Sequence, residues 1–173
     1  MPWVQRPRHL TVPLNPSSDE RRPGGTRFDG MLEQQGKTAW FFLICRRGED
    51  TPIGTTGLFN VDLTNGSAGI GISLGDPSDT GQGLGTDALE ALVDFGFGRL
   101  RLERMWLDVY EFNERAIRSY EKAGFVREGA ARHGAYRDGR FVDLVSMAIL
   151  RDEWATRRAA DAFPGRWPPP DVE

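Results

Sequence analysis

The sequence is poor in the residues that build metal centres and disulfides. It contains one cysteine, Cys45, and two histidines, His9 and His133. A single cysteine cannot form an intramolecular disulfide, and two distant histidines do not make the clustered ligand set of a zinc site. Cys45 lies in the apolar run 39–45, where we interpret it as a packed thiol rather than a nucleophile. We therefore expect no metal in this protein.

Long apolar runs and an excess of positive charge are also absent. No stretch approaches the roughly 18 apolar residues that cross a membrane as a helix. The net charge is −3, whereas nucleic-acid binding normally shows as a basic domain. Residues 1–8 include arginines, but no apolar segment follows them as it would in a secretory signal. These absences predict a soluble, cytoplasmic protein without a nucleic-acid or membrane partner.

The length of 173 residues fits one domain with its own core. Proline and glycine interrupt residues 1–37, which we interpret as irregular apart from a short helix at 27–36. Residues 38–160 form the regular domain, and 161–173 are predicted to be a mobile tail. The patterns predict strands at 39–46, 53–63, 68–74, 104–110, 125–132 and 141–150, and helices at 84–100, 113–123 and 152–160.

This order of elements predicts an α+β (mixed α/β) fold. An Asn-Gly pair at Asn65-Gly66 indicates a hairpin, so the strands before the long helix are expected to be antiparallel. The strand after that helix can lie parallel to the strand before it, through a right-handed crossover. Such a crossover places the turn at 76–86 above the sheet edge, with a helix N-terminus facing solvent.

The first chemical motif is a glycine-rich turn, with Gly81, Gly83 and Gly85 at alternate positions. Glycine allows positive φ and close approach of a ligand, and the following helix dipole favours an anion such as a pyrophosphate. A plain tight turn is the alternative. The turn lacks the Gly-Lys-Ser/Thr ending of a nucleoside-triphosphate loop, and its third glycine is one residue early for a dinucleotide fingerprint.

The second motif is the predicted helix that carries Asn113 and Tyr120. The two residues are seven positions apart, so they share one helix face at roughly 10 Å separation, and one ligand could touch both. Each also has a purely structural interpretation. Asn113 suits an N-cap, and Tyr120 suits a core position beside Ile117 and Phe125.

Together these motifs resemble the GNAT superfamily of N-acetyltransferases, and in particular the branch that acetylates the N-termini of ribosomal proteins. The resemblance runs from about Trp40 to Trp154. It implies a largely antiparallel sheet with one parallel, splayed strand pair, flanked by helices. It also implies transfer of an acetyl group from acetyl-CoA to a primary amine by direct attack in a ternary complex. The segments that carry the resemblance are Gly83-Leu84-Gly85-Thr86, Asn113-Glu114-Arg115-Ala116-Ile117, Tyr120-Glu121-Lys122-Ala123-Gly124-Phe125 and Tyr136–Asp143.

The resemblance also implies roles for single residues. Tyr120 would protonate the departing thiolate, and Asn113 would bind the cofactor near the pantetheine arm. The strand Ile72-Ser73-Leu74 would hold that arm and aim a backbone N–H at the thioester carbonyl. The pyrophosphate would be bound by the turn, at Thr80, Gly81, Gln82, Gly83, Leu84, Gly85 and Thr86.

The sequence departs from the family pattern in two places. Thr80 and Gln82 stand where relatives often have a cation or a longer polar side chain, so backbone dipoles would hold the phosphates. The usual first strand and helix have no evident counterpart, which would expose an edge near residues 53–63 and predicts a homodimer. The general base stays unassigned, with Asp76, Glu111 and Asp143 as candidates.

Two other functions stay open at this point. One is a non-catalytic acyl-CoA-binding or regulatory module on the same fold. The other is a dinucleotide-dependent oxidoreductase, which the glycine spacing disfavours. The amine acceptor is also open among peptide N-termini, polyamines, amino acids and antibiotics, because variable loops build acceptor pockets.

Overall fold

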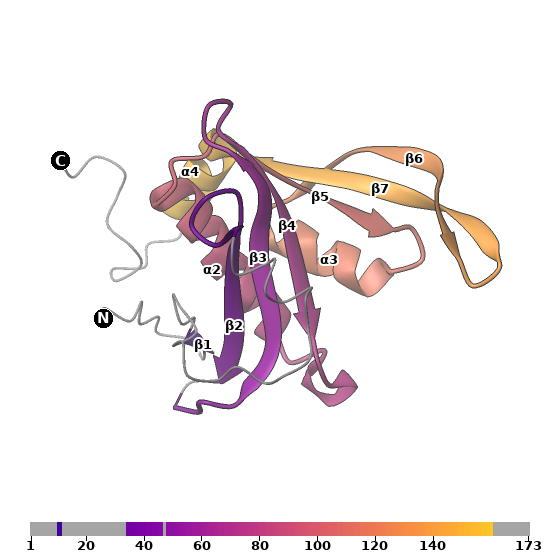
Figure 1. Ribbon diagram of the computed structural model, residues 1–173, viewed down its shortest axis with the longest axis horizontal. Coiled ribbons are helices and arrows are strands. Elements are labelled where there is room, and N and C mark those ends of the chain that lie inside the picture. Colours follow the sequence, from indigo (N-terminus) through magenta and orange to yellow (C-terminus); the bar gives the residue numbers. More distant parts are fainter. Residues whose placement is uncertain (1–9, 12–33, 47, 161–173) are drawn as a thin grey trace.

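The computed structural model of the chain describes residues 10–11, 34–46 and 48–160. The expected helix 27–36 and the tail 161–173 lie almost wholly outside these residues, as does most of segment 1–37. Within the described residues, seven strands form one sheet in the order β1-β2-β3-β4-β5-β7-β6 (Figure 1). The strands are β1 (Leu10–Thr11), β2 (Trp40–Arg46), β3 (Pro52–Asp62), β4 (Ser67–Leu74), β5 (Arg104–Tyr110), β6 (Val126–Arg137) and β7 (Arg140–Leu150).

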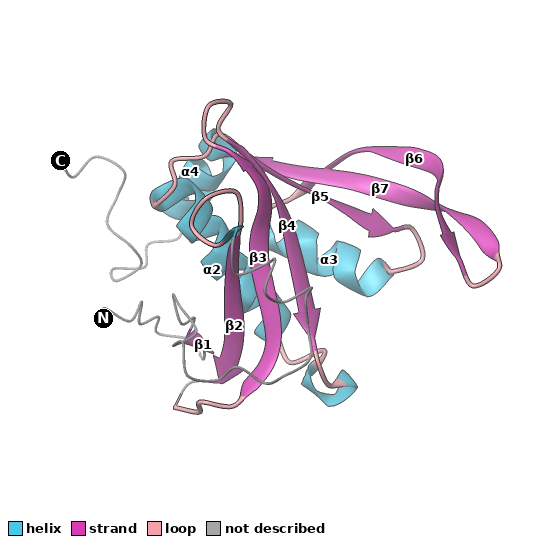
Figure 2. Ribbon diagram, in the orientation of Figure 1, coloured by secondary structure: helices cyan, strands magenta, loops and turns pink. Residues whose placement is uncertain are grey.

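Three helices, α2 (Leu84–Gly98), α3 (Glu114–Ala123) and α4 (Arg151–Ala160), cover one face of the sheet in the described chain (Figure 2). Leu89, Leu92 and Val93 of α2 are buried at helical spacing, as their periodicity predicts. α3 ends at Gly124, whose φ of +102° suits a left-handed C-cap. No helix of the described ranges has the length and apolarity to cross a membrane.

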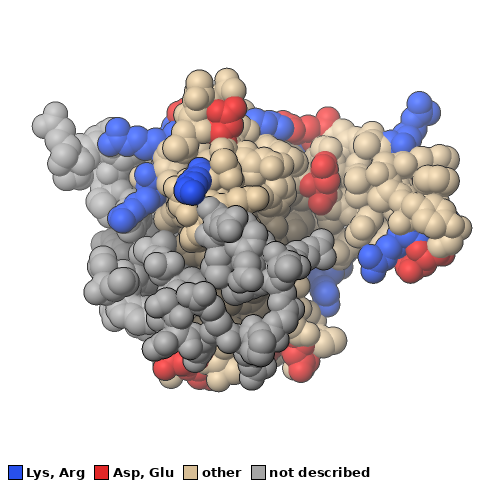
Figure 3. Space-filling model, in the orientation of Figure 1, with Lys and Arg blue, Asp and Glu red and all other residues tan. Residues whose placement is uncertain are grey.

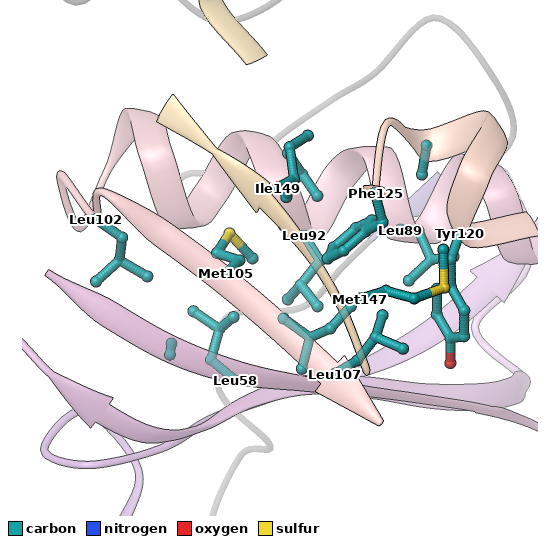
Figure 4. Packing of buried hydrophobic residues seen from close by; sticks show 14 of the residues in the cluster. Leu58, Leu89, Leu92, Leu102, Met105, Leu107, Tyr120, Phe125, Met147 and Ile149 are labelled. Atoms are coloured by element: carbon teal, nitrogen blue, oxygen red, sulfur yellow. The ribbon is translucent and has the colours of Figure 1, made fainter. Parts of the chain in front are cut away.

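Strand β5 runs through the centre of the core. Its alternate residues Met105, Leu107 and Val109 are buried under the helices, whereas Asp108 between them is exposed. Figure 4 shows Met105 and Leu107 packed with residues of α2, α3 and β7. The buried residues labelled there are Leu58, Leu89, Leu92, Leu102, Met105, Leu107, Tyr120, Phe125, Met147 and Ile149.

The pair β4 and β5 is parallel, as the sequence predicts, and it separates early. The pairing ends at Gly69↔Trp106, although both strands continue, to Leu74 and Tyr110. Figure 1 shows the two strands diverging beyond this point. The backbone groups of β4 beyond Gly69 are therefore not paired with β5.

The expectation of an exposed edge near residues 53–63 is wrong. β3 pairs with β2 on one side and β4 on the other, and Leu58 is fully buried. β2 itself pairs with β1 through Leu10↔Arg46 and Thr11↔Cys45. A strand therefore does precede β2, and the sequence analysis missed it because two residues between prolines show no period.

The strand predicted at 125–132 is also too short, because β6 extends to Arg137. Its register against β7 shifts at two irregularities, one between Arg127 and Gly129 and one between Ala131 and Ala135. These shifts break the alternation that defines a strand in sequence.

Candidate active site

The glycine-rich turn joins the short 3-10 helix η1 (Pro77–Asp79) to α2. Gly81 and Gly83 have φ of +80° and +84°, a region that residues with a side chain rarely adopt. Among the described atoms, none lies within 4 Å of where a Cβ would stand on either glycine. The turn therefore presents bare, accessible backbone.

The turn leads directly into the N-terminus of α2. Gly83 is the N-cap and supplies no side-chain cap. The first helical hydrogen bond runs from Asp87 N–H to the Gly83 carbonyl at 3.0 Å, so the N–H groups of Leu84, Gly85 and Thr86 have no helical acceptor. Three N–H groups and the helix dipole thus favour an anion at this point.

Gly85 differs from the other two glycines. It lies inside α2 without positive φ, so the expectation that it needs such a φ is wrong. A Cβ on Gly85 would stand 3.8 Å from Leu74 Cδ1. This is an ordinary van der Waals distance, so the packing of α2 on the end of β4 leaves room for a Cβ at this position.

A buried ion pair anchors the turn to the sheet. Asp79 is only 6% exposed, and its Oδ1 accepts a hydrogen bond from Arg46 Nη2 at the end of β2. The pair joins residues 33 positions apart, and for this reason no local pattern indicated it.

The side chains of Thr80 and Gln82 stabilise the turn itself. Thr80 Oγ1 donates to the Pro77 carbonyl at 2.5 Å, and Gln82 Nε2 donates to the Ser78 carbonyl at 2.7 Å. Both hydrogen bonds stay within the η1 segment. The Thr80 N–H also donates to the Pro77 carbonyl, at 3.1 Å, so a phosphate contact through a backbone N–H is left to Gln82.

The predicted pantetheine strand lies beside the divergence of β4 and β5. Ile72 and Leu74 pack toward Ile44 and Ala88, whereas Ser73 between them is exposed. The side chains of Ile72 and Leu74 are thus part of the core packing. What β4 offers a ligand here is its backbone on the side that β5 leaves unpaired.

Asn113 caps α3. Its Oδ1 accepts from Ala116 N–H at 3.2 Å, and its own N–H donates to the Tyr110 carbonyl at 2.9 Å. The structure therefore confirms Asn113 as the N-cap. Among the described residues its Nδ2 has no acceptor, and a cofactor contact by Asn113 stays a prediction.

Tyr120 lies in the core with 8% of its surface exposed, and its ring packs edge-on against Phe125 at 5.9 Å between centroids. Figure 4 shows its hydroxyl directed away from Phe125 and Leu89. Burial raises the pKa of Tyr120 above its usual value of 10.0. A phenol in this state is protonated at neutral pH, as a proton donor must be.

Each of the three carboxylates considered as a general base already accepts a backbone hydrogen bond. Asp76 accepts from Ser78 N–H at 2.7 Å, which lowers the pKa of Asp76. Glu111 accepts from Asp143 N–H at 3.3 Å, and Asp143 accepts from His133 N–H at 2.8 Å. These hydrogen bonds give all three carboxylates a structural role.

The structure draws attention to Asp108, which the sequence analysis did not consider. Asp108 is exposed two residues after Trp106, the last β5 residue paired with β4. Its Oδ1 accepts from Ser146 Oγ at 2.6 Å. It lies on the sheet face opposite Tyr120, because its neighbours Leu107 and Val109 point into the core that contains Tyr120. Only the strand alternation on β5 could have indicated it.

Comparison with known proteins identifies the class. A family model described as an acetyltransferase (GNAT) domain matches residues 2–126, and the chain therefore belongs to the GNAT acetyltransferases. It is an acyltransferase, and acetyl-CoA is its acyl donor. The match includes residues 2–37, the segment in which the sequence shows no evident counterpart of the usual first strand and helix. In the described ranges, no group of three or more His, Cys, Asp or Glu side chains could hold a metal ion.

Individual relatives agree with this family. The chain is 32% identical to the uncharacterized N-acetyltransferase p20 of Bacillus licheniformis over 124 residues, which cover 72% of this chain and 68% of the relative. It is 35% identical over 101 residues to the putative ribosomal N-acetyltransferase YdaF of Bacillus subtilis, covering 58% and 55% of the two chains. A dodecameric spermidine N-acetyltransferase from Vibrio cholerae superposes with a TM-score of 0.68 at 25% identity, covering 75% of this chain and 74% of that one.

The family assignment decides between the functions left open above. An oxidoreductase and a non-catalytic module are both set aside in favour of the acyltransferase.

Proposed function

We propose that this protein transfers the acetyl group of acetyl-CoA to a primary amine by direct attack in a ternary complex. The observation that carries the proposal is the position of the glycine-rich turn. It lies where β4 ends and α2 begins, beside the divergence of β4 from β5 and on the core side that contains Tyr120. One extended thioester can therefore reach from the turn to the divergence.

The turn suits the pyrophosphate of acetyl-CoA. Open backbone at Gly81 and Gly83 allows close approach, and the N–H groups of Leu84, Gly85 and Thr86 are aligned with the helix dipole. The unpaired edge of β4 between Ile70 and Leu74 suits the amide groups of the pantetheine arm, because backbone groups there have no β5 partner.

The reaction needs a proton acceptor for the amine and a proton donor for the thiolate. The amine nitrogen forms a bond to the acetyl carbon, the carbon–sulfur bond breaks, and the amine loses one proton. Tyr120 donates its phenolic proton to the sulfur, a role that its raised pKa permits at neutral pH.

Asp108 is the proton acceptor that the geometry favours. It stands at the divergence of β4 and β5 on the face opposite Tyr120, so an amine and a thioester that enter from opposite faces would meet between the two residues. The hydrogen bond from Ser146 orients the carboxylate and leaves its second oxygen for the amine proton.

The acceptor class is also a proposal. The names of related proteins include acetyltransferases of spermidine and, putatively, of ribosomal proteins, and both reactions acetylate an amine. A primary amine is thus common to both. The cytoplasmic location expected from the sequence stays a prediction.

Release of free thiol from acetyl-CoA, measured against a panel of amines with mass spectrometry of the products, tests this function. The expected result is amine-dependent thiol release and an acetylated amine from the wild type, with loss of turnover in Asp108→Asn. Thiol release without any acetylated product would contradict amine transfer. Full turnover by Asp108→Asn would contradict the role given to Asp108.

We also propose that the protein forms a homodimer, through a surface other than the edge first expected. The edge first expected is occupied, but β6 forms the opposite edge of the sheet and almost all of its residues are exposed. The dodecameric relative shows that a protein of this fold can self-associate. Light scattering at micromolar concentration distinguishes a dimer from a monomer.

A further inference from the structure

The β6–β7 hairpin carries a cavity that neither Tyr120 nor Asp108 lines. This cavity of about 580 Å³ is an open hollow lined by Arg132, His133 and Asp143, of which Arg132 and His133 are exposed. The hairpin projects from the body of the molecule beyond the ends of β4 and β5 (Figure 1). Figure 3 shows Lys and Arg atoms on this projecting part.

An irregularity in β6 forms the wall of the cavity. The register passes from Ala131↔Leu144 to Ala135↔Val142, so residues 132–134 of β6 lie opposite the single residue Asp143 of β7. His133 has a φ of +54°, and its N–H is held by Asp143 Oδ1 at 2.8 Å. Bulges of this kind re-aim side chains and are common beside active sites. This bulge brings Arg132 and His133 to the cavity.

The charged side chains at the cavity differ in whether they already have hydrogen-bond partners. Asp143 accepts the His133 N–H, and the His133 ring stacks on Phe141 at 5.8 Å between centroids. Arg132, in contrast, has no hydrogen bond or carboxylate partner among the described residues. Its guanidinium therefore keeps all five donors for a ligand, and this group fits a planar oxyanion in a bidentate way.

The cavity is coupled to the start of α3. Glu111 N–H donates to the Asp143 carbonyl at 3.1 Å, and Asp143 N–H donates back to Glu111 Oε1 at 3.3 Å. Glu111 lies two residues before Asn113, the N-cap of α3. From there Tyr120 is seven residues along the helix, roughly 10 Å. On β7, Asp143 is three residues from Ser146, the hydrogen-bond partner of Asp108, which is roughly 10 Å at the spacing of a strand. An extended acceptor held at the cavity can therefore present its amine near Asp108.

We propose that this cavity binds an oxyanion of the acceptor, so that the preferred substrate is a primary amine that also carries a carboxylate, with Arg132 as its ligand. The inference rests on the proposed function and narrows it. Arg132 disfavours a polyamine, because a second ammonium group would lie near an unpaired guanidinium. Arg132 acts in specificity and takes no part in the chemical step.

Matched pairs of amines that differ only in the carboxylate test the proposal. Lysine against cadaverine and ornithine against putrescine are suitable pairs, with O-phosphoethanolamine against ethanolamine to distinguish phosphate from carboxylate. We expect the wild type to prefer the carboxylate member of each pair by about tenfold or more in kcat/KM, the effect typical of one charge-assisted hydrogen bond. In Arg132→Gln this preference should disappear, while kcat/KM for the member without an anion stays unchanged.

The control is Arg140→Gln, since Arg140 is an exposed arginine on the same hairpin that does not line the cavity. It should keep the preference of the wild type. Arg132→Lys keeps the charge without the planar fork and should restore part of the preference.

Equal or better turnover of cadaverine and putrescine would overturn the anion site and leave the proposed function intact. A preference for O-phosphoethanolamine alone would overturn the carboxylate assignment. If no amine in any arm is acetylated while acetyl-CoA still binds, both the anion site and the proposed function fail. A preference that survives Arg132→Gln would also overturn the inference.

Discussion

The buried Arg46–Asp79 pair makes the geometry of the glycine-rich turn depend on the sheet, and Asp79→Ala tests this. The Asp79 side chain is 8% exposed and largely removed from water, whereas the Arg46 side chain is 35% exposed. Removing one partner of a buried pair costs about 3–5 kcal/mol, because the remaining charge is left uncompensated. Arg46 is a third exposed and can partly rehydrate, so we expect a loss of about 2–3 kcal/mol in the free energy of unfolding.

The same substitution should weaken acetyl-CoA binding more than it slows the chemical step. Without Asp79, η1 loses its attachment to β2, and the N–H groups of the following turn lose their fixed direction. We expect KM for acetyl-CoA to rise about tenfold, which corresponds to about 1.4 kcal/mol, with kcat nearly unchanged. Urea denaturation measures the stability term, and thiol release at varied acetyl-CoA measures KM.

Asp76 provides the matched control in the same segment. Its carboxylate is exposed and caps η1 through Ser78 N–H, so Asp76→Ala removes a cap and no buried charge. Equal effects of Asp76→Ala and Asp79→Ala on KM would refute the argument that the buried pair positions the turn. So would a stable Asp79→Ala variant with an unchanged KM.

Three further predictions concern single residues. Tyr120→Phe keeps the contact with Phe125 and should lower kcat by about 10²-fold in thiol release without changing the KM for acetyl-CoA. Because the pKa of Tyr120 is raised, wild-type activity should persist below pH 10 and fall only as pH rises through the higher pKa. Gly83→Val should weaken acetyl-CoA binding in calorimetry more than Gly85→Val does, since only Gly83 has positive φ. Asp94→Ala should lower stability by about 3 kcal/mol in urea denaturation, because Trp154 Nε1 at 2.8 Å and Arg158 both lose their buried acceptor.

Most of the fold was predictable because its elements are periodic and locally punctuated. The strand at 104–110 and the helix before Gly124 match the structure almost residue for residue. The parallel relation of β4 and β5 followed from the crossover through α2. β1 and the outer half of β6 were missed because one is two residues long and the other contains a bulge that breaks the period of a strand.

The residues of the candidate site also divide into those that the sequence indicated and those that it did not. The turn at Gly81 and Gly83 and the helix from Asn113 to Tyr120 are short, contiguous segments, so sequence reasoning found them. Asp79, Asp108 and Arg132 acquire their roles from partners or neighbours that are distant in sequence, on β2, β4 and β7. No local pattern distinguishes them from ordinary surface charges.

This division follows from what each half of the site must recognise. The donor half binds a constant group, and a backbone turn at the start of α2 can bind it with almost any side chain at Thr80 or Gln82, which hydrogen-bond only to their own turn. The acceptor half must distinguish amines, and in our proposal it does so with side chains of β6, a strand that contributes little to the core because it is exposed along almost its whole length. Changes at residues 132–134 can therefore alter the acceptor without disturbing Tyr120 or the turn, because the bulge is held by Asp143 and by the stacking of His133 on Phe141, and residues 132–134 are not part of the core that contains Tyr120.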